Sequence, residues 1–134
     1  MTRDSIFIPQ YGWRIDLFLD TCCEDAYRIV GLMRSIGASD RVCVKAFASL
    51  YECREDEGFT YSSADYRYTV MAVHRASSFG EFLNTLTHEN AHVCAHIVRS
   101  VDGDMDEETF CSLSGWLAMM EADAILEVAD NEKK

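Results

Sequence analysis

The sequence predicts an α+β domain, with a small antiparallel or mixed sheet packed with about four helices. The hydrophobic pattern changes along the chain from the alternation typical of strands to the three- and four-residue spacing typical of helices. These patterns follow one another as strand, helix, helix, two strands and two helices. About half of the residues (49%) are hydrophobic, and no repeat or linker divides the chain, so residues 1–134 are expected to form one domain. We expect the helices to cover one side of the sheet.

The first half of the chain is predicted to contain an extended segment and two helices. Hydrophobic side chains alternate with mostly polar ones within residues 5–19, which favours an extended segment. Thr21–Glu24 resembles a capping box and predicts a helix that ends near Ser35. Ser39 or Asp40 is expected to cap a further helix.

The second half is predicted to contain a hairpin and two longer helices. The two strand-like segments are Phe59–Ser62 and Tyr66–His74. Ser78 is the expected N-cap of a helix that ends near Gly103. The last helix is expected at roughly residues 105–128, and three large side chains are expected in its core: Trp116, Met119 and Met120.

Composition and charge exclude several classes of partner. The net charge of −11 argues against nucleic acid or an anionic membrane surface as a partner. No run of 18 apolar residues predicts a transmembrane helix. Residues 1–5 lack the apolar stretch of a signal peptide, so we expect a cytoplasmic location with the six cysteines as reduced thiols.

The strongest chemical signal is the motif His-Glu-x-x-His, formed by His88, Glu89 and His92. Residues four apart on a helix share one face, with Cβ atoms about 5–6 Å apart, so the two imidazoles can converge on one Zn²⁺ ion. Glu89 lies about a third of a turn from His88, where a carboxylate can act as general base toward a metal-activated water. The motif therefore predicts a hydrolytic zinc site.

A catalytic zinc ion needs a third protein ligand in addition to water. Glu107 and Glu108 belong to the first turns of the last helix, which should fold back against the motif helix because the connection is short. Some bend or offset is needed for either carboxylate to reach the metal. His96, one turn beyond His92, is a further candidate, either as a ligand or as a group that lines the cleft.

The stretch from Phe82 to Gly115 resembles the gluzincins, a group of metallopeptidases in which a helix bearing a glutamate ligand follows the His-Glu-x-x-His helix. The resemblance favours Glu108 as that ligand, because Cys111 and Gly115 follow it at the family's spacing. Glu107 is then expected to cap the helix. The resemblance implies a single, minimal zincin-like metallopeptidase domain over residues 1–134.

Nearly the whole chain is also similar to short metallopeptidase-like proteins of phages and mobile elements of gut bacteria. Four segments carry this likeness: Tyr11-Gly12-Trp13, Phe59-Thr60-Tyr61-Ser62, Glu81-Phe82 and Glu107-Glu108. Two positions depart from the pattern. Asn90 stands where the motif helix usually has an apolar residue, and Ser112 stands where relatives often have a tyrosine that would polarise the substrate.

These observations together predict a zinc-dependent metallopeptidase that hydrolyses a peptide or protein substrate. The strand Tyr66–Val73 is expected to lie beside the cleft and to pair with extended substrate. Two alternatives stay open: a catalytically inactive zinc-binding or protein-interaction module on a zincin-like fold, and a zinc-free interaction protein.

Overall fold

The computed structural model describes residues 1–132 and contains a four-stranded mixed sheet. Its strands are β1 (Thr2–Ile8), β2 (Trp13–Thr21), β3 (Gly58–Ser63) and β4 (Tyr68–His74), and their order across the sheet is β1-β2-β4-β3. β2 and β4 are parallel, whereas β1 and β3 pair antiparallel to their neighbours. The predicted α+β class is confirmed, and the extended segment of the sequence prediction is a hairpin of two strands.

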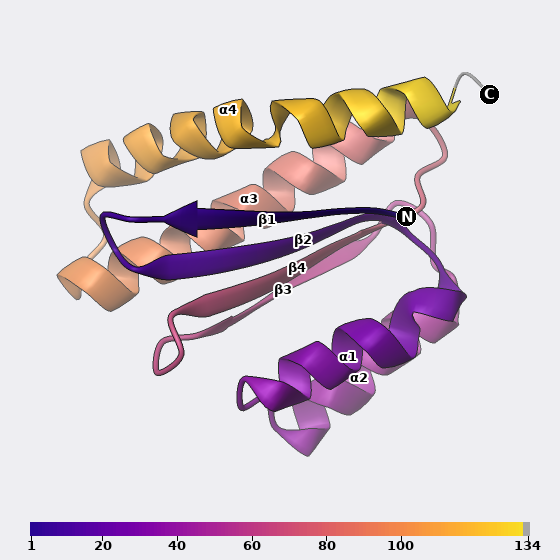
Figure 1. The fold of residues 1–134 in the computed structure, drawn as a ribbon, viewed down its shortest axis with the longest axis horizontal. Coiled ribbons are helices and arrows are strands. Elements are labelled where there is room, and N and C mark those ends of the chain that lie inside the picture. Colours follow the sequence, from indigo (N-terminus) through magenta and orange to yellow (C-terminus); the bar gives the residue numbers. More distant parts are fainter. Residues whose placement is uncertain (133–134) are drawn as a thin grey trace.

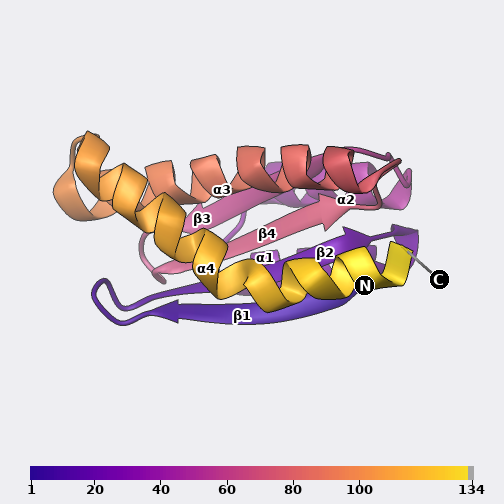
Figure 2. The ribbon, with the colours of Figure 1, turned by 90° about the horizontal axis from the view of Figure 1, so that it is seen from above.

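Helices cover both faces of this sheet (Figure 1). After a 3₁₀ turn at Cys23–Asp25, α1 (Ala26–Ser35) and α2 (Asp40–Tyr51) pack on one face. α3 (Phe79–Asp102) and α4 (Glu107–Glu132) pack on the other. Figure 2 shows α3 running along β3 and β4, while α4 crosses it obliquely toward β1.

The expectation that helices cover only one side of the sheet is wrong, because the two central strands are buried on both faces. In β2, Leu17 and Leu19 face α3 and α4, whereas Phe18 faces α1. In β4, Met71 contributes to the first core and Val70 to the second. Strands buried on both faces have continuous apolar runs rather than strict alternation, and both strands show such runs.

Three of the predicted helix boundaries are confirmed, two by capping hydrogen bonds and one by a backbone conformation. The Ser39 side chain accepts a hydrogen bond from the backbone N–H of Val42, and Ser78 accepts one from that of Glu81. Gly103 adopts a left-handed conformation (φ 72°) at the end of α3. The capping box predicted at Thr21 is wrong, since β2 continues through Thr21 and Cys22 pairs instead with Asp25.

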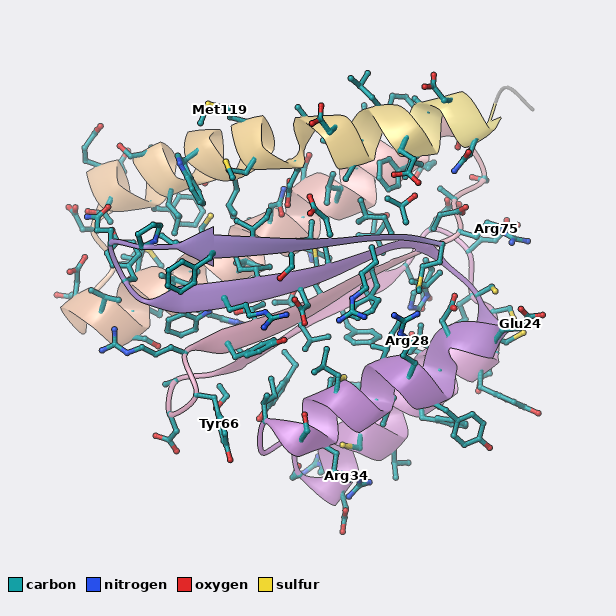
Figure 3. The ribbon with its side chains drawn as sticks, viewed as in Figure 1. Glu24, Arg28, Arg34, Tyr66, Arg75 and Met119 are labelled. Carbon is teal, nitrogen blue, oxygen red and sulfur yellow. The ribbon has the colours of Figure 1, made fainter. Side chains whose placement is uncertain are left out.

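The last helix differs from its prediction at both ends. Asp106 caps it, because its carboxylate accepts a hydrogen bond from the Thr109 backbone N–H at 3.1 Å. Glu107 is therefore the first helical residue and not a cap. Met119 and Met120 are exposed rather than in the core, and Figure 3 shows Met119 on the outer side of α4. The helix reaches Glu132 rather than residue 128, and residues 133–134 lie outside the described residues.

The position of the strands in the sheet corrects one functional expectation. β4 is flanked by β2 and β3, so the prediction that Tyr66–Val73 pairs with substrate is wrong. The strand at this edge of the sheet is β3. Among residues 1–132, no helix combines the length and the apolar content that crossing a membrane would require.

Candidate functional site

The candidate site is built on α3, which rests on β3 and β4 through its apolar side. Phe82, Leu86, Val93 and Ile97 of α3 are buried in this contact. The polar face of the helix carries the motif residues and turns toward the edge of the sheet formed by β3. The helix is continuous for 24 residues, so the motif is held on a rigid element.

His88 and His92 converge as the motif predicts. Their Nε2 atoms lie 3.2 Å apart, and their ring centroids are 4.8 Å apart. Two ligands bound at about 2.0–2.1 Å to one tetrahedral ion stand roughly 3.3 Å apart, so the pair fits two positions of a zinc site. Both side chains are exposed, which leaves the pair accessible to a metal ion.

Glu89 is buried and is held from the edge strand. The Thr60 hydroxyl on β3 donates a hydrogen bond of 2.8 Å to Glu89 Oε1. Gly58 allows the strand to approach, because a Cβ there would lie 3.2 Å from Glu89 Cγ. Glu89 and His88 line the same open cleft, with a volume of about 340 Å³. One oxygen of the carboxylate is thus fixed, in a cleft that reaches the first histidine.

His96 continues the polar face of α3 one turn beyond His92, with 6.1 Å between the two ring centroids. Its Nδ1 lies 2.8 Å from the hydroxyl of Ser62 on β3. The side chain is half-buried, and this burial is the main cause that lowers the pKa of His96; the nearby charges of His92 and Arg99 lower it further. The neutral imidazole is therefore favoured.

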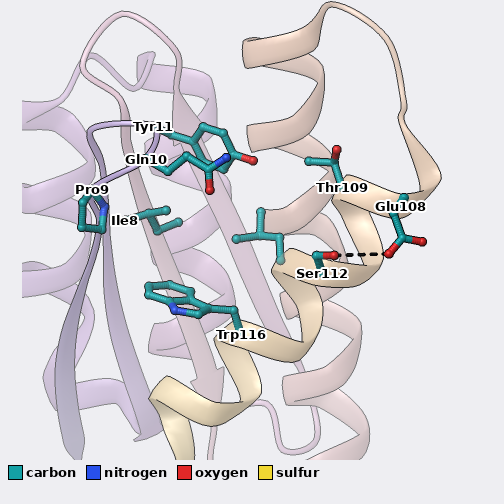
Figure 4. Close-up of a pocket in the computed structure, with 9 residues that line it drawn as sticks. Ile8, Pro9, Gln10, Tyr11, Glu108, Thr109, Ser112 and Trp116 are labelled. Atoms are coloured by element: carbon teal, nitrogen blue, oxygen red, sulfur yellow. Dashed lines mark hydrogen bonds between the residues drawn. The ribbon is translucent and has the colours of Figure 1, made fainter.

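Neither Glu107 nor Glu108 lies with the histidine pair. α3 continues for ten residues past His92, which is about 15 Å along the helix axis, before the chain turns back into α4. Glu108 accepts a weak hydrogen bond from Ser112 at 3.5 Å, beside a cleft of about 430 Å³ between α4 and the β1–β2 turn (Figure 4). Within residues 1–132, no three His, Cys, Asp or Glu side chains are grouped closely enough to hold a metal ion.

The side of the pair that faces the α3–α4 connection is mostly apolar. Met105 and Phe110 line a second open cleft there with His88 and His92, with a volume of about 380 Å³, and Arg99 also lines it. The structure thus provides two converging imidazoles with a buried carboxylate on one side and an apolar wall on the other.

The sequence analysis assigned no role in the site to three of its residues: Gly58, Thr60 and Ser62. They alternate along β3 and share the face that carries Met71 and Val73 of β4, which is the face covered by α3. The alternation of small or polar residues in this segment was the available signal. The contact between β3 and α3 could not be inferred, because it depends on the order of the strands in the sheet.

Asn90, the departure from the usual pattern, points away from the histidines. Its side-chain amide donates a 2.6 Å hydrogen bond to Glu121 of α4. This polar side chain on α3 thus has its hydrogen-bond partner on the neighbouring helix.

Comparisons of the chain with models of protein families, with curated protein sequences and with solved structures find no match.

Proposed function

We propose that this protein is a zinc-dependent metallopeptidase in which His88 and His92 bind the metal ion and Glu89 is the general base. The observation that supports the proposal most directly is the 3.2 Å separation of the two Nε2 atoms. Without a metal ion this separation is that of a hydrogen bond between the rings, and the same arrangement fits two ligands of one ion.

Glu89 has the contacts expected of a base that must be held in place. Thr60 donates to one carboxylate oxygen and thereby holds the side chain in one orientation. The bound Zn²⁺ would supply Lewis acidity toward the substrate carbonyl and toward water. Glu89 accepts the proton of the attacking water and passes it to the leaving amine.

We further propose that β3, rather than β4, receives the substrate. β3 is paired with β4 on one side only, and its Thr60 and Ser62 bind Glu89 and His96. An extended peptide can therefore add as a strand along its open edge, with backbone hydrogen bonds supplying affinity. In that position the peptide passes in front of Glu89.

Glu108 is the proposed third ligand, with Glu107 and His96 as the alternatives. Neither carboxylate is grouped with the pair among the described residues, so the first turn of α4 must move before Glu107 or Glu108 can bind. The short connection at residues 103–106 is the segment in which such a movement would occur.

A second candidate function is a zinc-binding or protein-interaction module that does not catalyse hydrolysis. Two observations favour it: only two ligands converge among the described residues, and Ser112 occupies the position of the expected tyrosine. This module would share the metal-binding pair but would not need Glu89 as a base.

The experiment that separates these functions is the substitution Glu89→Gln. Zinc content is measured by mass spectrometry of metals, and cleavage is measured with a quenched-fluorescent peptide library. The proposal predicts about one zinc per chain for both proteins, with cleavage by the wild type alone. The exposed Glu81 on the same helix provides a matched control, since Glu81→Gln should leave both properties unchanged. A zinc-loaded wild type that cleaves none of the library supports the inactive module.

A further inference from the structure

A buried chain of hydrogen bonds ends at His96. The Trp13 indole N–H donates to the Thr69 hydroxyl at 2.9 Å. The hydroxyls of Thr69 and Ser62 lie 2.8 Å apart, and Ser62 Oγ lies 2.8 Å from His96 Nδ1. Thr69 is fully buried, so its hydroxyl proton must find an acceptor within the protein.

The inner end of the chain sets the direction of its first two bonds. An indole N–H can only donate, so the Thr69 oxygen accepts from Trp13. Within residues 1–132, the Thr69 hydroxyl has one other partner, Ser62, and its own proton must therefore go to the Ser62 oxygen or remain buried without an acceptor. A buried donor without an acceptor costs about 1–3 kcal/mol. The Ser62 oxygen thus accepts from Thr69, and the Ser62 proton is available to His96 Nδ1.

A hydrogen bond from Ser62 to Nδ1 favours one tautomer of His96. When Nδ1 accepts a hydrogen bond, the proton of the neutral ring is on Nε2. In the opposite tautomer the Ser62 oxygen would accept from both Thr69 and His96, and the Ser62 hydroxyl would lose its acceptor within the chain of hydrogen bonds. A protonated Nε2 cannot bind a metal ion, so in this tautomer His96 is not the third ligand.

The position of His96 on α3 places the ring beside the reaction site. At about 100° per residue, His92, His96 and Glu89 lie about 40°, 80° and 100° from His88 around the helix. His96 is thus on the face between the second histidine and the base. It is one turn nearer to the C-terminus of α3.

The edge strand binds His96 and Glu89 at neighbouring positions. Glu89 is bound to Thr60 and His96 to Ser62, each at 2.8 Å, and these two residues are neighbours on one face of β3. Alternate residues of a strand are about 7 Å apart, close to the repeat of an extended substrate on the same edge. One peptide unit paired with β3 can therefore lie between the carboxylate and the imidazole.

We propose that His96, held by Ser62 in the Nε2–H tautomer, donates a hydrogen bond to the carbonyl oxygen of the peptide bond that is cleaved. It would stabilise the negative charge that develops on this oxygen. This inference rests on the proposed peptidase function and adds a substrate-contacting residue to it.

The tautomer is tested first, without substrate and without metal, by ¹⁵N–¹H correlation spectra of the histidine rings. The expected spectrum has a protonated Nε2 and an unprotonated Nδ1 for His96 at pH 7.5. Thr69→Val should remove the donor to Ser62 and yield a mixture of tautomers. A wild-type ring protonated at Nδ1 alone would overturn the inference, whatever the protein cleaves.

The catalytic role is tested with His96→Ala and His96→Gln on the best substrate from the peptide library. We expect zinc affinity, measured against a chromophoric chelator, to remain within about threefold in both variants. kcat should fall about 10²–10³-fold in His96→Ala with KM little changed, and partly recover in His96→Gln, which retains an N–H donor. Thermal melts of both variants confirm folding.

Two results would contradict this role. A loss of zinc affinity of tenfold or more in both variants identifies His96 as a ligand, which overturns the inference and leaves the peptidase proposal in place. A wild type that binds no zinc and cleaves no peptide overturns the peptidase proposal and the role of His96 with it.

Discussion

The side-chain amide of Asn90 on α3 donates a 2.6 Å hydrogen bond to Oε1 of Glu121, a fully buried carboxyl group on α4. The other oxygens of the pair, Asn90 Oδ1 and Glu121 Oε2, are buried without a partner among residues 1–132. A proton on Oε2 could bond to Oδ1 and give an acid–amide pair with two hydrogen bonds. Burial, together with the charge of Asp4, raises the pKa of Glu121 to about 7. The hydrogen bond from Asn90 acts in the opposite direction and lowers this pKa.

The stability of the protein should therefore fall as the pH rises through 7. Glu121 has a higher pKa in the folded chain than in the unfolded chain, so its neutral form stabilises the fold fully below about pH 4.5. This contribution is lost as the group ionises, and it amounts to at most about 3 kcal/mol. Urea unfolding between pH 5 and 8.5 measures this change in the free energy of unfolding. Other carboxylates should give the opposite trend, a loss of stability as the pH falls, at the acid end of this range.

Glu121→Gln should remove most of this pH dependence. Glutamine has nearly the same shape and supplies an N–H donor to Asn90 Oδ1 at every pH. We expect a gain of about 1–3 kcal/mol in the free energy of unfolding at pH 8 and little change at pH 5. Glu127→Gln, at an exposed position on the same helix, serves as control. Equal effects at both pH values would show that Glu121 is already ionised at pH 5.

Zinc should raise the melting temperature in a manner that depends on the histidine pair. A ligand present at 100 times its dissociation constant stabilises the folded state by about 2.7 kcal/mol, whereas His92→Ala removes one of the converging imidazoles and should abolish the shift. Mg²⁺, which prefers oxygen ligands, is the control ion and should have no effect. A zinc shift of the same size in His92→Ala would indicate binding elsewhere on the chain.

Gly58→Ala should destabilise the edge strand on which Glu89 depends. An added Cβ would lie 2.6 Å from the carbonyl oxygen of Ala72, so β3 must move away from β4. Overpacking of this kind costs about 1–3 kcal/mol, and we expect a parallel loss of cleavage.

Gly115→Ala is the matched control for this substitution. It lies in the exposed middle of α4 with nothing within 4 Å of the added Cβ. Alanine should stabilise the helix by about 0.5–1 kcal/mol. Chemical denaturation of the two variants side by side gives both values, and a stable Gly58→Ala protein would show that β3 adapts without cost.

The sequence alone determined the local features of this protein. Hydrophobic spacing and capping side chains gave α2 and α3 their correct beginnings, and Gly103 marked the end of α3. The convergence of His88 and His92 also followed from the sequence, because helical periodicity places residues four apart on one face. These features depend on contacts within a few residues.

The tertiary structure decided everything that depends on which elements become neighbours. It placed helices on both faces of the sheet, made β3 rather than β4 the edge strand, and brought Thr60 and Ser62 to Glu89 and His96. It also left Glu108 beside Ser112 at the far end of α3. Spacing along one helix is set by the backbone, whereas contacts between distant segments are set by the packing of both cores, which no local pattern encodes.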